Sequence, residues 1–177
     1  MTTPAFRAPV TADPTLRRAR SGGRPTTSAT QLAVLPLLET LRDHADDPDL
    51  YEVLDLDATE RTWVRVKATA EYELWLISWP AGASTDWHDH GPSAGAFTVL
   101  RGALTEHTFD GGLQLAEIRP GHSRAFAAGY THNVSNETDE PALSLHAYSP
   151  RLHTMTRFRF YGDRLEVIGV ERAGQEW

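Results

Sequence analysis

The chain has 177 residues, of which 40% are hydrophobic and 23% are charged, a balance typical of one soluble globular domain. Its net charge of −7 argues against a nucleic-acid surface, which needs clustered Lys and Arg, and no apolar stretch is long enough to span a membrane. Because cysteine is absent, disulfides, thiolate metal ligands and cysteine nucleophiles are excluded, and any metal must be held by histidine or carboxylate.

Composition divides the chain into segments. Residues 1–28 are polar and lack the apolar core of a secretory signal, so we expect a flexible leader on a cytoplasmic protein. The remainder, 29–177, is predicted to be a single domain. Its first part, about 29–58, is expected to be helical, and its second part, about 60–170, is expected to form a β-barrel.

The prediction of a helical part depends on the spacing of its leucines. Between residues 29 and 44, leucines recur at near-helical intervals, at Leu32, Leu35, Leu38 and Leu41. Pro36 lies within this pattern, and a proline inside a helix removes a backbone donor. We therefore expect one or two short helices, with Pro36 at a break or in a first turn.

After residue 60, short runs rich in β-branched and aromatic residues are separated by Gly, Pro, Asn and Asp. This pattern predicts an antiparallel sandwich or barrel. No repeat of fixed period is present, which excludes solenoids and propellers. The fold class is therefore mainly β, preceded by short helices.

The segment DWHDHG contains a pair of histidines, His88 and His90. On a β-strand, residues i and i+2 point to the same face, so the two imidazoles converge while Asp89 points away. Neutral imidazole is the commonest metal ligand in proteins. An isolated pair of this kind is also typical of surface or core histidines. The spacing of the residues around the pair is therefore needed to indicate a metal site.

That spacing resembles the two sequence motifs of the cupin superfamily. The first motif is matched by Gly82, His88, His90 and Gly102, with Gly95 where the motif has glutamate. The second is matched by Gly121, Gly129, His132 and Asn136, with Ala127 where proline is usual. The resemblance implies a cupin double-stranded β-helix, a jelly-roll barrel, and a metal held by His88, His90 and His132.

Replacing the motif glutamate with Gly95 turns a four-ligand site into a neutral site of three histidines. About three coordination positions then stay open, as in non-haem Fe(II) oxygenases that bind substrate and O2 side by side. His122, which directly follows Gly121, is a rival third ligand. It lies outside the motif position, and we interpret it as a structural residue.

The segment ALSLHAYSP places three polar side chains on one strand face: Ser144, His146 and Tyr148. Alone, this alternation is typical of an exposed face. Together with the histidine motifs it resembles the type I cysteine dioxygenase family, in which Ser, His and Tyr form a hydrogen-bonded relay at the iron site. The resemblance implies these catalytic roles here, and it implies a cis bond between Ser149 and Pro150.

The same resemblance implies a substrate pocket. Arg65 matches the family arginine that binds the substrate carboxylate, a role that suits the planar guanidinium, although it could instead lie on a solvent face. Ile77 and Trp79 would line the pocket wall together with Tyr148. Gly95 stands where animal members carry a cysteine that cross-links to the tyrosine, so Tyr148 is expected to work unmodified.

The function implied by the resemblance is dioxygenation of a small thiol. One Fe(II) per chain would bind L-cysteine through thiolate and amine, and both atoms of O2 would pass to sulfur to give cysteine sulfinate. The expected partners are the small thiol and O2, with no nucleic acid and no membrane. A monomer is favoured over a homodimer.

Three alternatives stay open at this point. The substrate could be another small thiol carboxylate, such as 3-mercaptopropionate. The chain could also be a non-catalytic cupin that binds a metal or a ligand. Other cupin enzymes, such as isomerases and quercetinase-like dioxygenases, commonly keep the motif glutamate that this chain lacks.

Overall fold

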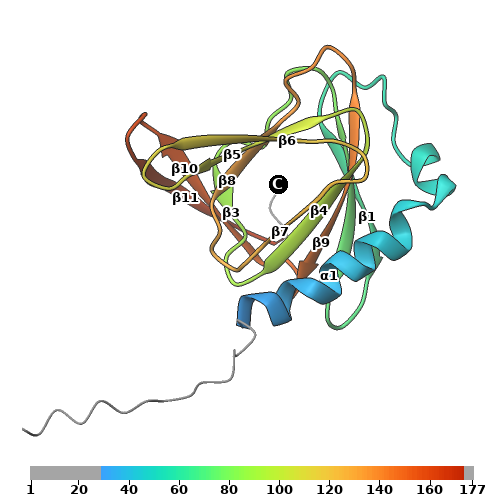
Figure 1. Ribbon diagram of the computed structural model, residues 1–177, viewed down its shortest axis with the longest axis horizontal. Helices are drawn as coiled ribbons and strands as arrows, with labels where there is room; N and C mark the ends of the chain where they lie inside the picture. Colours follow the sequence, from blue (N-terminus) through green and yellow to red (C-terminus); the bar gives the residue numbers. More distant parts are fainter. Residues whose placement is uncertain (1–28, 174–177) are drawn as a thin grey trace, which may run out of the picture.

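The computed structural model describes residues 29–173, so the predicted leader, 1–28, lies outside the described part of the chain. Two antiparallel sheets face each other, and one helix lies along the outside (Figure 1). The five-stranded sheet has the order β1 (Thr62–Ala68), β2 (Glu73–Trp79), β9 (Ala142–Ser149), β4 (Ala94–Arg101), β7 (Ser123–Phe126). The six-stranded sheet has the order β11 (Leu165–Arg172), β10 (Thr154–Phe160), β3 (His88–Asp89), β8 (His132–Ser135), β5 (Leu104–Phe109), β6 (Leu113–Ile118).

The central strands of the five-stranded sheet are buried on both faces. In β9, Leu143 and Leu145 belong to the core beneath the helix, while Ala142 and Tyr148 belong to the core between the sheets. Because neighbouring residues of a strand point to opposite faces, the even-numbered side chains of β9 line the barrel interior. The predicted polar face of this strand is therefore an interior face.

Helix α1 (Ala29–Ala45) is continuous through Pro36, where the sequence suggested a break. Its side chains Leu37 and Leu41 are buried on the five-stranded sheet, and this packing holds the helix together despite the missing proline donor. The buried stripe is also shifted from the predicted one, since Leu35 is 51% exposed. A 3-10 helix, η1 (Pro48–Glu52), follows directly.

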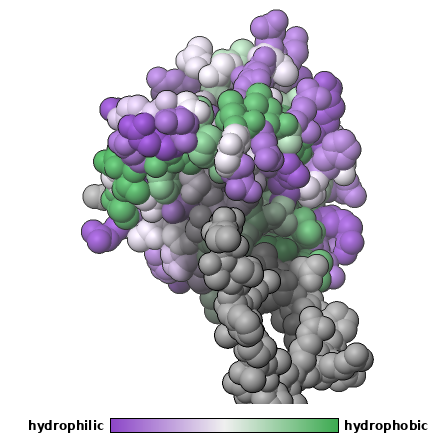
Figure 2. All heavy atoms as spheres, turned by 60° about the vertical axis from the view of Figure 1, so that its left-hand side comes forward, coloured by the Kyte–Doolittle hydropathy of each residue, from purple (hydrophilic) through white to green (hydrophobic). Residues whose placement is uncertain are grey.

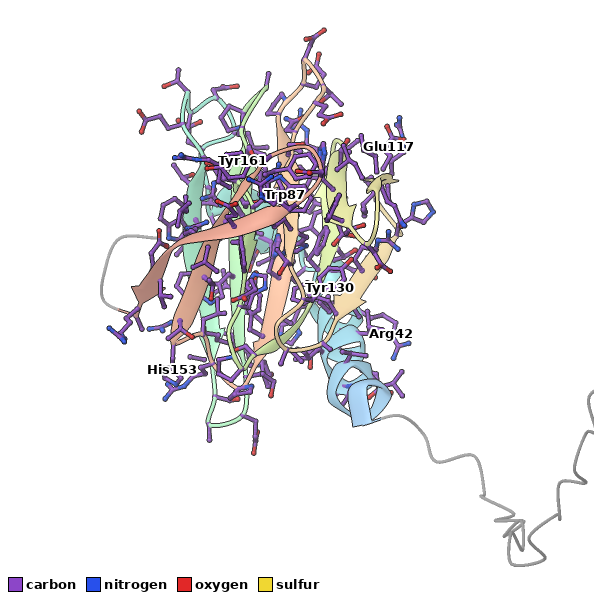
Figure 3. All side chains as sticks on the ribbon, turned by 90° about the vertical axis from the view of Figure 1, so that its left-hand side faces the viewer. Arg42, Trp87, Glu117, Tyr130, His153 and Tyr161 are labelled. Atoms are coloured by element: carbon purple, nitrogen blue, oxygen red, sulfur yellow. The ribbon has the colours of Figure 1, made fainter. Side chains whose placement is uncertain are left out.

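The six-stranded sheet ends in a hairpin of β10 and β11. Trp87, immediately before β3, packs on Phe160 of β10 with ring centroids 5.4 Å apart, and it lies beside this hairpin in Figure 3. On the face shown in Figure 2, hydrophobic side chains lie in separate groups among hydrophilic ones. Within residues 29–173, no helix has the length and apolar character needed to cross a membrane.

Candidate active site

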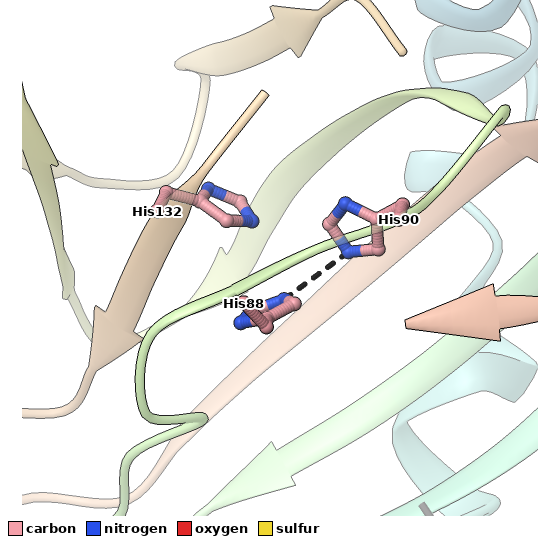
Figure 4. A group of neighbouring side chains, drawn as sticks. All are labelled: His88, His90 and His132. Atoms are coloured by element: carbon pink, nitrogen blue, oxygen red, sulfur yellow. Dashed lines mark hydrogen bonds between the residues drawn. The ribbon is translucent and has the colours of Figure 1, made fainter. Parts of the chain in front are cut away.

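Three histidines from the six-stranded sheet and its β3–β4 connection meet inside the barrel (Figure 4). His88 lies on β3, His132 is its cross-strand partner on β8, and His90 follows two residues after His88. One nitrogen from each of the three rings lies within 4.8 Å of the other two. All three side chains are buried, which brings together the ligand set expected from the sequence.

Hydrogen bonds determine which ring nitrogen of His88 and of His132 is left without a proton and available to a metal. Nδ1 of His88 donates to the Asp86 carbonyl at 2.9 Å, and Nδ1 of His132 donates to Oε1 of Glu106 at 2.8 Å. In the neutral ring this leaves Nε2 with a free lone pair. Burial, followed by the neighbouring histidines, lowers the pKa of His88 and of His90 well below the usual value, so both rings stay neutral.

This arrangement fits a metal ion. Nε2 of His88 and Nε2 of His90 lie 3.2 Å apart, and two imidazole ligands at a right angle, each about 2.1 Å from a metal, would lie about 3 Å apart. Three imidazole ligands suit iron, zinc, copper or nickel better than the harder magnesium or calcium ions. The group could therefore bind a transition metal through three nitrogen ligands.

A buried carboxylate supports one of the three ligands. Glu106 on β5 is only 2% exposed, and its two oxygens accept hydrogen bonds from His132 and from Nε of Arg124, the latter at 2.9 Å. Carboxylates that hold the remote nitrogen of a metal-binding histidine fix its orientation and raise its basicity. This residue could not be predicted from the sequence, because a lone glutamate in a strand is ordinarily exposed to solvent.

Gly95 on β4 lies opposite Tyr148 of β9, and no room exists there for a fourth ligand. A Cβ atom at Gly95 would collide with the ring of Phe126 and would lie 3.0 Å from Cδ1 of Tyr148. The Phe126 ring in turn stacks on His90, with centroids 5.0 Å apart. Phe126 thus fills the space at the glutamate position of the motif and packs against a ligand ring.

The three polar residues of β9 form a continuous hydrogen-bonded chain. Oγ of Ser144 lies 2.8 Å from Nε2 of His146, and the Tyr148 hydroxyl lies 3.3 Å from Nδ1 of the same ring. Trp79 on β2 extends the chain, since its indole Nε1 donates to Oγ of Ser144 at 2.8 Å. All four side chains are buried, and Tyr148 also packs on His90 at a centroid distance of 4.8 Å.

The direction of this chain follows from the donors and acceptors. The Trp79 indole can only donate, so Ser144 accepts from it, and within residues 29–173 Nε2 of His146 is the acceptor that remains for the serine hydrogen. Burial, with smaller contributions from His132 and Arg61, lowers the pKa of His146 to about 3, so the ring carries one proton, on Nδ1. That proton is donated to the Tyr148 oxygen, which leaves the tyrosine hydrogen free to point into the cavity.

An open cavity leads from the protein surface to His88 and Tyr148. It is lined by ten residues: Arg61, Trp63, Trp75, Ile77, Thr85, His88, Tyr148, Leu152, Met155 and Arg157. Two of them are arginines, and none is acidic, so the cavity has a positive electrostatic character. Burial is also the main cause that raises the pKa of the Tyr148 hydroxyl, which keeps it protonated and able to donate.

Arg61 takes the place in the cavity that sequence analysis assigned to Arg65. Arg65 is 51% exposed, lies over the ring of Trp75, and pairs with Oε2 of Glu73 at 3.4 Å. Arg61 lies just before β1 and Trp63 lies on it, and both line the cavity, whereas Arg65, further along β1, does not. The structure therefore places Arg61, and not Arg65, at this cavity.

The two residues predicted for the pocket wall differ in outcome. Ile77 lines the cavity, as expected. Trp79 does not line it, because its ring is fully buried between the sheets, where it holds Ser144 and lies 5.4 Å from the Arg61 guanidinium carbon.

The Ser149–Pro150 bond is cis. His122 is exposed and takes no part in the three-histidine group.

Solved structures of other proteins resemble this chain in overall fold. A protein from Thermus thermophilus is 25% identical, with a TM-score of 0.51, and the match covers 58% of this chain and 95% of that one. A double-stranded β-helix protein from Klebsiella pneumoniae is 16% identical with a TM-score of 0.51, and the match covers 68% of this chain and 94% of that one. The second likeness shows the fold alone, which is the predicted cupin barrel.

The family is shown by sequence. The family model described as cysteine dioxygenase type I matches residues 27–160, a range that includes the three histidines, the β9 relay and both cavity arginines. The chain therefore belongs to the cysteine dioxygenase type I family.

Proposed function

We propose that the protein is a non-haem Fe(II)-dependent thiol dioxygenase that converts L-cysteine and O2 to cysteine sulfinate. The observation that carries this proposal is a cavity at which a free arginine and a tyrosine that can donate a hydrogen bond meet His88, one member of the three-histidine group. A cupin that only binds a ligand has no need of the oriented relay behind Tyr148.

Each protein group has a defined task in this proposal. Arg61 binds the substrate carboxylate through its planar guanidinium, which places the thiol toward His88. Within residues 29–173, Arg61 has no hydrogen bond or ion pair of its own, so its donors are free for a ligand. The walls formed by Trp63, Trp75 and Ile77 exclude water from the bound substrate.

Iron bound to the three histidines would supply the site at which thiolate and O2 react, with both oxygen atoms passing to sulfur and no external reductant consumed. Tyr148 donates a hydrogen bond from its neutral hydroxyl to the oxygen side of the reacting group. His146 holds the tyrosine oxygen in place, and Ser144 and Trp79 hold His146 in the required tautomer.

A second substrate fits the same cavity. Because none of the described residues that line the cavity is acidic, none of them is suited to pair with an ammonium group. A thiol carboxylate without an amine, such as 3-mercaptopropionate, would meet the same arginine and the same ligands. The choice between cysteine and such a thiol therefore depends on whether an amine adds affinity at the metal.

The test is O2 consumption by iron-loaded protein with a panel of small thiols, compared as kcat/KM. We expect thiol-dependent O2 uptake with L-cysteine or 3-mercaptopropionate, and its loss together with iron in His132→Ala. Thiols without a carboxylate, such as cysteamine, should be poor substrates because Arg61 has nothing to bind. If no thiol supports O2 uptake by protein with a full complement of iron, the proposal fails.

A further inference from the structure

The two arginines of the cavity differ in their partners. Arg61 lies against aromatic rings, with its guanidinium carbon 5.1 Å from the ring centroid of Trp63 and 5.4 Å from that of Trp79. A guanidinium that packs on aromatic faces keeps its N–H groups available for an anion. Arg61 is thus a free cation at the cavity.

Arg157, in contrast, is already held. Its Nη1 donates to the Thr85 carbonyl at 3.0 Å, and its Nη2 donates to Oε2 of Glu171 at 2.8 Å. The ion pair is mostly shielded from solvent, since the two side chains are 17% and 33% exposed. Glu171 lies on β11, the strand hydrogen-bonded to the Arg157 strand β10, and it is absent from the cavity lining itself. Glu171 instead lines an adjoining pocket that shares Arg61 and Arg157 with this cavity, and its charge neutralises Arg157 from that side.

We propose that Glu171 is a specificity-determining residue, which holds Arg157 so that Arg61 is the only free cation among the described residues that line the cavity. Glu171 so restricts the substrate to thiols with a single carboxylate. The inference rests on the proposed function and specifies its substrate class. A second carboxylate would have to displace Glu171 from Arg157 or lie beside a like charge in a partly buried site.

The test compares propionate with succinate as thiol-free probes of one and two carboxylates. Trp63 and Trp75 line the cavity, so tryptophan fluorescence of the iron-loaded protein under nitrogen reports binding without turnover. In Glu171→Gln, Arg157 loses its counter-charge, and one freed guanidinium–carboxylate contact should tighten succinate relative to propionate by about tenfold or more. Adding Arg157→Gln to this variant should abolish the gain.

A matched control lies on the same strand. Glu166 of β11 makes the same kind of ion pair, with Arg164 at 2.7 Å, but it is 48% exposed and lies away from the cavity lining. Glu166→Gln should leave the succinate-to-propionate ratio unchanged. A Glu171→Gln ratio equal to that of the unmodified protein would overturn the proposal, as would a gain that survives the additional loss of Arg157.

The unmodified protein provides an independent test in case Glu171→Gln does not fold. Succinate should bind it no more than about threefold more tightly than propionate, because only one carboxylate meets a free cation. A tenfold preference for succinate would overturn the proposal without any variant. These readouts do not depend on turnover, so a protein that oxidises no thiol would refute the proposed function and leave the charge selectivity to be judged separately.

Discussion

The buried carboxylate behind His132 gives the sharpest quantitative prediction. In Glu106→Gln the side chain keeps its size, but its amide can no longer accept hydrogen bonds at both ends. Either His132 or Arg124, which now donate to the two oxygens at 2.8 and 2.9 Å, must lose its acceptor. A hydrogen bond to a charged group contributes about 1.5–3 kcal/mol. Partners of this kind typically change metal affinity by about 10- to 100-fold.

The measurement is a competition titration of iron(II) or zinc against a chromophoric chelator at fixed pH. We expect metal affinity to fall within that range while the protein stays folded by circular dichroism. Glu117→Gln is the matched control, because Glu117 pairs with Arg119 on the exposed surface and should have no effect. Metal affinity within threefold of the unmodified value would refute the claim that Glu106 supports the metal ligand.

The remaining predictions concern the cavity, the relay and its protonation. Arg61→Gln should raise KM for a thiol carboxylate by about tenfold or more, whereas Arg65→Gln should leave it within about twofold, and the reverse order would restore the assignment to Arg65. Trp79→Phe should lower kcat by about tenfold with little change in KM, and 15N NMR should show the His146 proton no longer confined to Nδ1; an unchanged tautomer would contradict the proposed direction of the relay. Because the pKa of His146 is about 3 in the folded protein, the unfolded chain binds a proton that the native ring does not. Below about pH 6.5 the free energy of unfolding should therefore fall by about 1.4 kcal/mol per pH unit through this ring, and urea denaturation should show a shallower dependence in His146→Gln.

Local spacing accounts for what the sequence could predict of the site. His88 on β3 and His90 just after it converge because they are two residues apart, and the period of two likewise aligns Ser144 with His146 and Tyr148 on β9. These relations depend only on short stretches of chain being extended. The structure adds that the face of β9 that carries Ser144, His146 and Tyr148 points inward, because the helix covers the other face of the five-stranded sheet.

Relations between distant strands could not be predicted in the same way. In the sequence, a period of two assigns Arg61 and Arg65 to the same side of the chain, so it cannot say which of them reaches the cavity. Arg157 and Glu171 meet only through the β10–β11 pairing, and Glu106 reaches His132 only across β5 and β8. Register between strands is set by the whole barrel, and it is not visible in the local composition.

The packing of the helix could likewise be predicted only in part from local sequence patterns. The leucine pattern predicted its existence, but the buried stripe is set by how α1 lies on the five-stranded sheet. Leu37 therefore joins the predicted Leu41 at the interface, while the predicted Leu35 is exposed.

The most direct test of the central claim is the fate of oxygen at the three-histidine site. Iron-loaded protein should convert L-cysteine under 18O2 to cysteine sulfinate that carries two labelled oxygen atoms, with one O2 consumed per thiol. The conversion should disappear in His132→Ala. Disulfide as the only product, sulfinate with a single labelled oxygen, or full turnover without His132 would contradict dioxygenation at this site.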